Sequence, residues 1–197
     1  GYAVTATGKP TVGPSTFSVE AWFKTSSTSG GKIVGWGNAT TASSTSYDRH
    51  IYINGTGQVT FGVYSGAAKT ITSGTGYNDG QWHHVVGAVD QNTGMTFYID
   101  GRRIGAVTGP MTPEQTTGYW HIGGDTVGTW PNYPSSRYLN GTIDEVAVYP
   151  TALTPTQVAA HYTASGRTVP NPTDPAYAYG QAVTASSPTI YWRLDES

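Results

Sequence analysis

The sequence predicts an all-β fold, an antiparallel two-sheet jelly-roll sandwich with one short C-terminal helix. Short alternating segments separated by turn residues fill most of the 197 residues, and a single stretch carries helix signals. Glycine is abundant, with 26 residues, and only 11% of residues are charged, against a typical ~25%. Because aromatic residues reach 12%, this low charge indicates a folded core and not a disordered chain.

The first clear strand is Phe17–Lys24, in which alternate side chains from Phe17 to Phe23 face one way and Ser18, Glu20, Trp22 and Lys24 face the other. Asn54–Gly57 is a hairpin turn in which glycine supplies the positive φ angles. In chain order, the expected strands are Phe17–Lys24, Lys32–Trp36, Arg49–Ile53, Gln58–Tyr64, Lys69–Thr72, Trp82–Val89, Met95–Ile99, Arg103–Val107, Tyr119–Gly123 and Tyr138–Tyr149.

One helix is expected after Leu153. Thr154 is suited to the N-cap, Pro155 to the first helical position and Gln157 to the third, which together make a capping box. Val158, Ala159 and Tyr162 can form an apolar face, and Gly166 can end the helix. The sequence therefore predicts one domain over 1–166, a Pro-rich linker over 167–188 and a further strand within 189–197.

The composition excludes several classes of function. The 10 lysines and arginines form no basic stripe, so no nucleic-acid partner is expected. No apolar run approaches the ~18–20 residues of a membrane span, so no membrane insertion is expected. The chain has no cysteine, which excludes disulfides and thiolate zinc sites. Few lysines with many Thr, Ser, Gly and Tyr residues are typical of a secreted or cell-surface bacterial protein.

Several ordered stretches resemble the laminin-G-like jelly-roll modules of the concanavalin-A-like lectin/glucanase superfamily: Phe17–Phe23, Gln81–Val86, Tyr98–Gly101 and Gly141–Tyr149, continuing into the helix. The resemblance implies a non-catalytic carbohydrate-binding or adhesion module of a larger secreted or cell-surface bacterial protein, with a glycan or a cell-surface protein as partner. A structural or protein-interaction spacer in a tandem array is the alternative, and a glycoside hydrolase is much less favoured.

Members of this family usually open with a strand resembling Tyr191–Glu196, which here stands at the C-terminal end. Either the chain ends at the start of a following tandem module, or it is permuted. Ile190, Trp192 and Leu194 share one face, so this segment has the pattern of a strand that completes a sandwich. It could do so in its own molecule or by strand exchange with a neighbouring module or molecule.

The long loop Asp125–Arg137 is the first candidate binding site. Trp130 and Tyr133 offer flat faces for stacking on sugars, and Asn132 and Arg137 can form hydrogen bonds with hydroxyl groups. Trp36, Tyr47 and Arg49 are expected near it at the same rim. The structural alternative is that the loop is an aromatic lid over one end of the core.

Calcium is the expected cofactor, because hard cations take carboxylate and backbone oxygen ligands and modules resembling this one often hold a single Ca²⁺ at a loop rim. The candidate ligands are Asp48 with Asp125, or Asp144 with Asp195. The alternative role for these aspartates is turn capping.

A catalytic carboxylate pair is not expected. Glu20 has no second carboxylate on its face of the strand, and adjacent residues such as Asp144 and Glu145 point to opposite faces of an extended strand.

Overall fold

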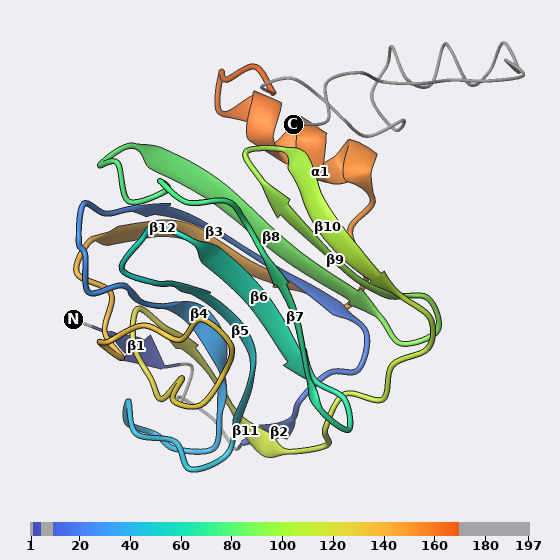
Figure 1. Cartoon of the computed structure of the whole chain (residues 1–197). Coiled ribbons are helices and arrows are strands. Elements are labelled where there is room, and N and C mark those ends of the chain that lie inside the picture. The colour runs from blue at the N-terminus through green and yellow to red at the C-terminus, as the bar shows by residue number, and fades with distance from the viewer. Residues whose placement is uncertain (1, 5–9, 170–197) are drawn as a thin grey trace, which may run out of the picture.

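The computed structural model describes residues 2–4 and 10–169 (Figure 1). This part of the chain forms twelve strands and one helix: β1 Ala3–Val4, β2 Thr11–Val12, β3 Phe17–Lys24, β4 Gly31–Gly37, β5 Tyr47–Ile53, β6 Val59–Tyr64, β7 Ala68–Thr72, β8 Trp82–Asp90, β9 Gly94–Ile99, β10 Arg102–Thr108, β11 Thr117–Ile122, β12 Thr142–Tyr149 and α1 Pro155–Ala164.

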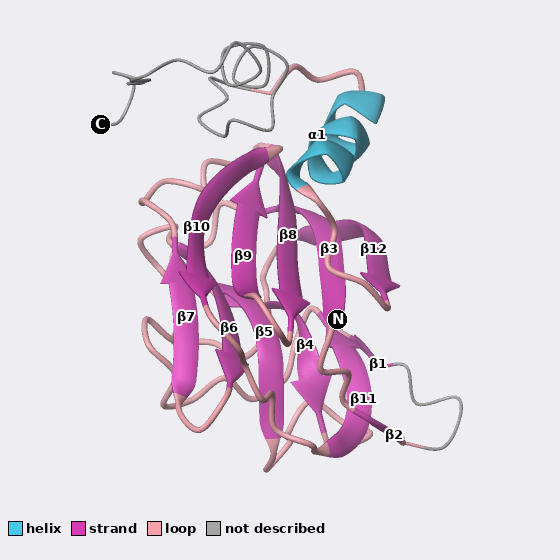
Figure 2. Cartoon of the chain, turned by 90° about the vertical axis from the view of Figure 1, so that its right-hand side faces the viewer, coloured by secondary structure: helices cyan, strands magenta, loops and turns pink. Residues whose placement is uncertain are grey.

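The strands form two sheets that face each other (Figures 1 and 2). The seven-stranded sheet has the order β1-β11-β4-β5-β6-β7, with β2 also paired to β11. The five-stranded sheet has the order β10-β9-β8-β3-β12, and neighbouring strands in both sheets run antiparallel. The predicted jelly-roll sandwich with one short helix is confirmed.

The main core lies between the two sheets, and the alternation of β3 decides which of its side chains enter it. Phe17, Val19, Ala21 and Phe23 are fully buried in this core, as the pattern predicts. Phe61 of β6 crosses from the other sheet to contact both Phe17 and Phe97. The other face of β3 is thereby left for the helix and for the open surface of the five-stranded sheet.

Most expected strands match to within two residues, with three differences. The last strand begins at Thr142 and not at Tyr138, because Tyr138 instead forms isolated bridges with Lys32 and Gly124 in the preceding loop. Strands β1 and β2 were not expected. Each has only two residues, too few to show an alternating pattern.

Helix α1 lies across the outer face of the five-stranded sheet (Figures 1 and 2). The capping box at Thr154 and Gln157 is present, and Gly166 follows the helix with φ 81°. Val158 packs with Leu153 on Val86, Ala88 and Tyr98 of the sheet. Of the helices in the described residues, none is long and apolar enough to cross a membrane.

The predicted linker and terminal strand fall almost wholly outside the described residues. Of the linker, Arg167 to Val169 are described, and Val169 is buried beside Gly101. Within the described part, β12 ends the five-stranded sheet with β3 as its one strand partner, and its Val148 is exposed. An added strand could pair at this edge or at β10, the other edge of the sheet. Strand exchange stays a prediction.

Gly87 gives a test of how closely the two sheets approach each other. A Cβ added at Gly87 of β8 would come within 2.5–2.7 Å of three atoms of the buried Phe61 ring, which has no room to move. We expect Gly87→Ala to destabilise the protein by about 1–3 kcal/mol in urea unfolding, as overpacked cores do. Gly74→Ala is the control, because nothing lies within 4 Å of the added carbon there. Equal stability of the two variants would contradict the close packing.

Candidate functional site

Trp130 of the 125–137 loop covers part of the outer face of the seven-stranded sheet, where it packs with Tyr52 of β5. Trp130 is only 6% exposed and packs edge-on against His50, with 4.7 Å between ring centres. Its ring also lies on Gly62, where a Cβ would come within 2.6 Å of it. The expectation of a solvent-facing Trp130 is therefore wrong. Trp130 is a covering side chain, as the alternative proposed, but it covers the outer face of the sheet and not one end of the core.

Three other predicted site residues form hydrogen bonds that join the 125–137 loop to the rest of the domain. Arg137 donates a hydrogen bond to the Ala42 carbonyl at 3.0 Å, and Asn132 donates to the Thr72 hydroxyl at 3.2 Å. The Tyr47 hydroxyl donates to the Gly128 carbonyl at 2.8 Å. Tyr133 is 58% exposed, so it is the aromatic side chain of this loop that still faces solvent.

Trp36 and Arg49 are buried and do not form an open rim. Trp36 is 2% exposed and packs edge-on against Trp120. The guanidinium of Arg49 is fully buried, at 2.6 Å from the Asp48 carboxylate, and donates further hydrogen bonds to the carbonyls of Pro14 and Glu114. The placement of these side chains at an accessible binding surface is therefore wrong.

Asp48 and Asp125 are both fully buried and both paired with basic side chains. Asp48 binds Arg49 and accepts a hydrogen bond from the Tyr64 amide, and Asp125 lies 3.3 Å from the Lys32 ammonium. Asp144 lies on the opposite sheet, and Asp195 falls outside the described residues. No group of three or more acidic or histidine side chains in the described ranges is arranged to hold a metal ion. Calcium binding remains a prediction, without a ligand cluster among these residues.

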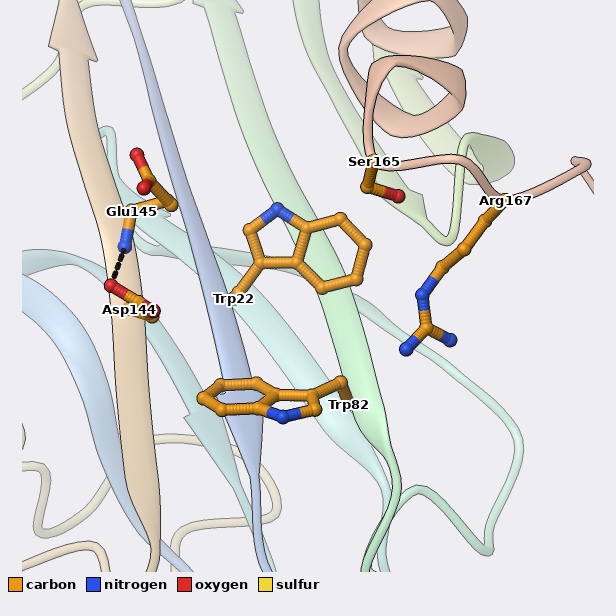
Figure 3. Close-up of a pocket in the computed structure, with 6 residues that line it drawn as sticks. All are labelled: Trp22, Trp82, Asp144, Glu145, Ser165 and Arg167. Atoms are coloured by element: carbon orange, nitrogen blue, oxygen red, sulfur yellow. Dashed lines mark hydrogen bonds between the residues drawn. The ribbon is translucent and has the colours of Figure 1, made fainter.

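The open hollow of interest lies on the outer face of the five-stranded sheet, beside the C-terminal end of α1 (Figure 3). It has a volume of about 270 Å³ and is lined by Trp22, Trp82, Asp144, Glu145, Ser165 and Arg167. We call it the Trp22–Trp82 pocket. The register explains its shape: Trp22 of β3 lies opposite His84 of β8, so Trp82 is its diagonal neighbour on the same face.

A bulge in β12 brings two carboxylates into this pocket. The pairing of β12 with β3 shifts between Asp144 and Ala147, and Glu145 has φ 48°, an unusual value for a residue with a side chain. Figure 3 shows both acidic side chains on the same wall, with the Glu145 amide donating to Asp144 at 2.9 Å. The expectation that these neighbours point to opposite faces is wrong, because it assumed a regular strand.

The two tryptophans are held differently. Trp22 is half-buried between ring contacts, stacked on Tyr162 of the helix at 5.7 Å and lying 5.1 Å from the His84 ring. The guanidinium carbon of Arg167 lies over the Trp22 ring at 5.3 Å. Trp82 is also half-buried and lies across the floor of the pocket from Trp22 (Figure 3). The pocket thus presents two aromatic surfaces, two carboxylates and one guanidinium.

Glu20 lies on the same sheet face, but beneath the helix. Its carboxylate accepts hydrogen bonds from the Tyr149 hydroxyl at 2.7 Å and from the His161 ring at 2.9 Å, and His84 Nε2 lies 3.5 Å away. Burial raises the pKa of this carboxyl, but the hydrogen bonds from His84, His161 and Tyr149 outweigh burial and lower the pKa to about 2. Glu20 is therefore an ionised group that ties α1 to the sheet.

Sequence reasoning missed Trp22, Trp82, Glu145, Ser165 and Arg167 as members of one pocket. One signal was present, since Trp22 falls on the polar face of the β3 pattern, where a large aromatic side chain is out of place. Trp82 comes from β8, Glu145 from the bulge in β12, and Ser165 and Arg167 from the end of α1. The sequence pattern does not predict how these segments align in space.

The fold defines a two-sheet jelly-roll module, and the site defines an open aromatic pocket on one sheet. The family model Laminin_G_3, described as the concanavalin A-like lectin/glucanases superfamily, matches residues 1–159. The chain belongs to this family. A search of curated proteins finds no significant match.

Solved structures with the same fold share little sequence with this chain. A carbohydrate-binding module (CBM40) of the Ruminococcus gnavus IT-sialidase, bound to α2,3-sialyllactose, has a TM-score of 0.60 and 16% identity, over 81% of this chain and 96% of that one. A heptameric SAP-like pentraxin from Limulus polyphemus has a TM-score of 0.56 and 20% identity, over 87% and 83%. Domains LG4-5 of the mouse laminin α1 chain have a TM-score of 0.53 and 15% identity, over 79% of this chain and 40% of that one.

Proposed function

We propose that this protein is a non-catalytic carbohydrate-binding module of a larger secreted or cell-surface protein, and that it binds glycan in the Trp22–Trp82 pocket. The main support for this proposal is that two tryptophan rings and three charged side chains line one open pocket. Sugars combine apolar C–H faces with many hydroxyl groups, so they need flat apolar surfaces beside a few polar groups. At about 270 Å³ the hollow is slightly smaller than the ~300–1,000 Å³ of sites for drug-sized ligands, which suits one or two sugar rings.

The similar structures give this proposal independent support. One of them is a carbohydrate-binding module whose description names bound sialyllactose. Its identity to this chain is only 16%, so it supports the statement that a domain of this fold can bind a glycan. It does not support any particular glycan for this chain.

The arrangement of carboxylates favours binding over hydrolysis. Glycosidases place two carboxyl groups on either side of the scissile bond. Here Asp144 and Glu145 share one wall of the pocket, and the opposite wall holds Ser165 and Arg167 (Figure 3). Glu20 is enclosed by Tyr149, His84 and His161 beneath the helix. Neither set places carboxyl groups on two facing walls of the pocket.

The spacer role in a tandem array is the second candidate. It is favoured by the exposed edge of β12, to which the Ile190–Leu194 segment of a neighbour could add. The bulge between Asp144 and Ala147 interrupts this edge and leaves two short regular runs, Thr142 to Asp144 and Ala147 to Tyr149. A bulge and exposed charges both disfavour pairing at an edge. A version lacking residues 188–197 that keeps its melting temperature and its oligomeric state would remove the strand-exchange proposal.

Replacing Trp82 tests the proposed site. We expect Trp82→Ala to weaken glycan binding by about two- to tenfold, because stacking on an aromatic ring contributes on the order of 0.5–1.5 kcal/mol. Binding is measured on a glycan array and then by calorimetry with the strongest glycan found. The control is Tyr133→Ala, which removes the exposed aromatic side chain of the 125–137 loop. Loss of binding in the control with unchanged binding in Trp82→Ala would move the site to the loop.

A further inference from the structure

We propose that the Trp22–Trp82 pocket selects glycans that carry a protonated amino group, such as oligomers of glucosamine. This inference rests on the proposed function and names the class of glycan. It follows from the charges and ring surfaces of the pocket, which are suited to an ammonium group.

The Trp22 ring already has a cation on its face. The guanidinium carbon of Arg167 lies 5.3 Å from the ring centre, within the ~6 Å at which a cation is attracted to the π-system. Arg167 is exposed, and its segment follows the helix directly. The Arg167 guanidinium therefore occupies the face of the Trp22 ring, and the cation of a ligand can displace it or bind next to it.

The carboxylates make the pocket negative. Asp144 and Glu145 contribute two negative charges and Arg167 one positive charge, and no ion pair joins Arg167 to either of them in the described structure. One oxygen of Asp144 accepts from the Glu145 amide, which fixes the direction of this carboxylate. The Glu145 side chain makes no hydrogen bond within the described residues. Both groups are exposed and can accept hydrogen bonds from a ligand.

An ammonium group on a sugar ring satisfies both features at once. The ring lies on an indole face while its amino group reaches the carboxylates with charge-assisted hydrogen bonds. Acetylation removes the positive charge and two of the donors, and an acidic sugar would be repelled by Asp144 and Glu145. The pocket should therefore rank amino sugars above N-acetylated sugars, and both above acidic sugars.

The test compares glucosamine oligomers with N-acetylglucosamine oligomers of the same length, by calorimetry at mildly acidic pH. We expect the amino form to bind about tenfold more tightly. The double variant D144N/E145Q should abolish this preference, because it weakens binding of the amino form far more than binding of the acetylated form. Arg167→Ala should strengthen binding of the amino form, because it frees the Trp22 face. Added salt should weaken the amino form selectively, since the Debye length falls from ~30 Å at 0.01 M to ~8 Å at 0.15 M.

The outcomes separate this inference from the proposed function. Equal affinity for the two oligomers in the wild-type protein, or weaker binding of the amino form by Arg167→Ala, overturns the selectivity and leaves glycan binding in place. Failure of every glycan on the array to bind overturns both. A lysine pentapeptide that binds more tightly than the glucosamine oligomer would show that the pocket takes a cationic protein segment, which also overturns the proposal.

Discussion

Arg49→Ala will destabilise the protein by about 3–5 kcal/mol, the range measured when one partner of a buried ion pair is removed. The guanidinium and the Asp48 carboxylate are both fully buried, and they lie 2.6 Å apart. Without Arg49, Asp48 is left as a buried charge, and the carbonyls of Gly13, Pro14 and Glu114 lose their donor. Chemical denaturation of the two proteins gives the difference directly.

The control for this prediction is the double variant D48N/R49M. It removes both charges together, so it should cost less than Arg49→Ala. The double-mutant cycle of D48N, R49M and D48N/R49M gives the coupling between the two side chains. Because the Arg49 side chain is inaccessible, any variant that remains folded should bind glycan normally. A loss of less than about 1 kcal/mol for Arg49→Ala, together with lost glycan binding, would restore Arg49 as a ligand-binding residue.

Glu20→Gln will remove about 3 kcal/mol of stability at neutral pH, and the loss will depend on pH. The folded-state pKa of Glu20 is about 2, against an ordinary value of 4.5. Each unit of pKa shift corresponds to about 1.36 kcal/mol, which gives the expected magnitude. Because the pKa is lowered in the folded state, the unfolded state binds more protons between these two values. The contribution of Glu20 is therefore complete above pH 4.5 and is lost as the pH falls toward 2.

Urea unfolding at a series of pH values checks this prediction. The wild-type protein should lose stability more steeply than Glu20→Gln over this range, so the two curves should converge at the acidic end. Glu145→Gln is the matched control, since Glu145 is exposed and its replacement should change stability by less than about 0.5 kcal/mol. Parallel curves for wild type and Glu20→Gln would mean that Glu20 does not anchor α1 through its charge.

The fold and most of the local structure can be predicted from the amino-acid sequence. The alternation of Phe17–Lys24 predicts which side chains enter the core, and the side chains from Phe17 to Phe23 are buried as expected. Thr154, Pro155 and Gln157 predict the start of the helix through local hydrogen bonds. Such features depend on residues within a few positions of each other, so a single sequence contains the information needed to predict them.

Which side chains meet in one site depends on contacts between distant segments, and the sequence pattern does not predict these contacts. A tryptophan in a long loop can be exposed for binding or can be buried against the domain. Trp130 is buried because it packs on Gly62 and His50, which lie more than sixty residues away in the sequence. The pocket required the register of β3 against β8 and a bulge that turns Glu145 beside Asp144. Register and bulges follow from the packing of the whole sandwich, because shifting one strand by a residue would exchange its buried and exposed faces.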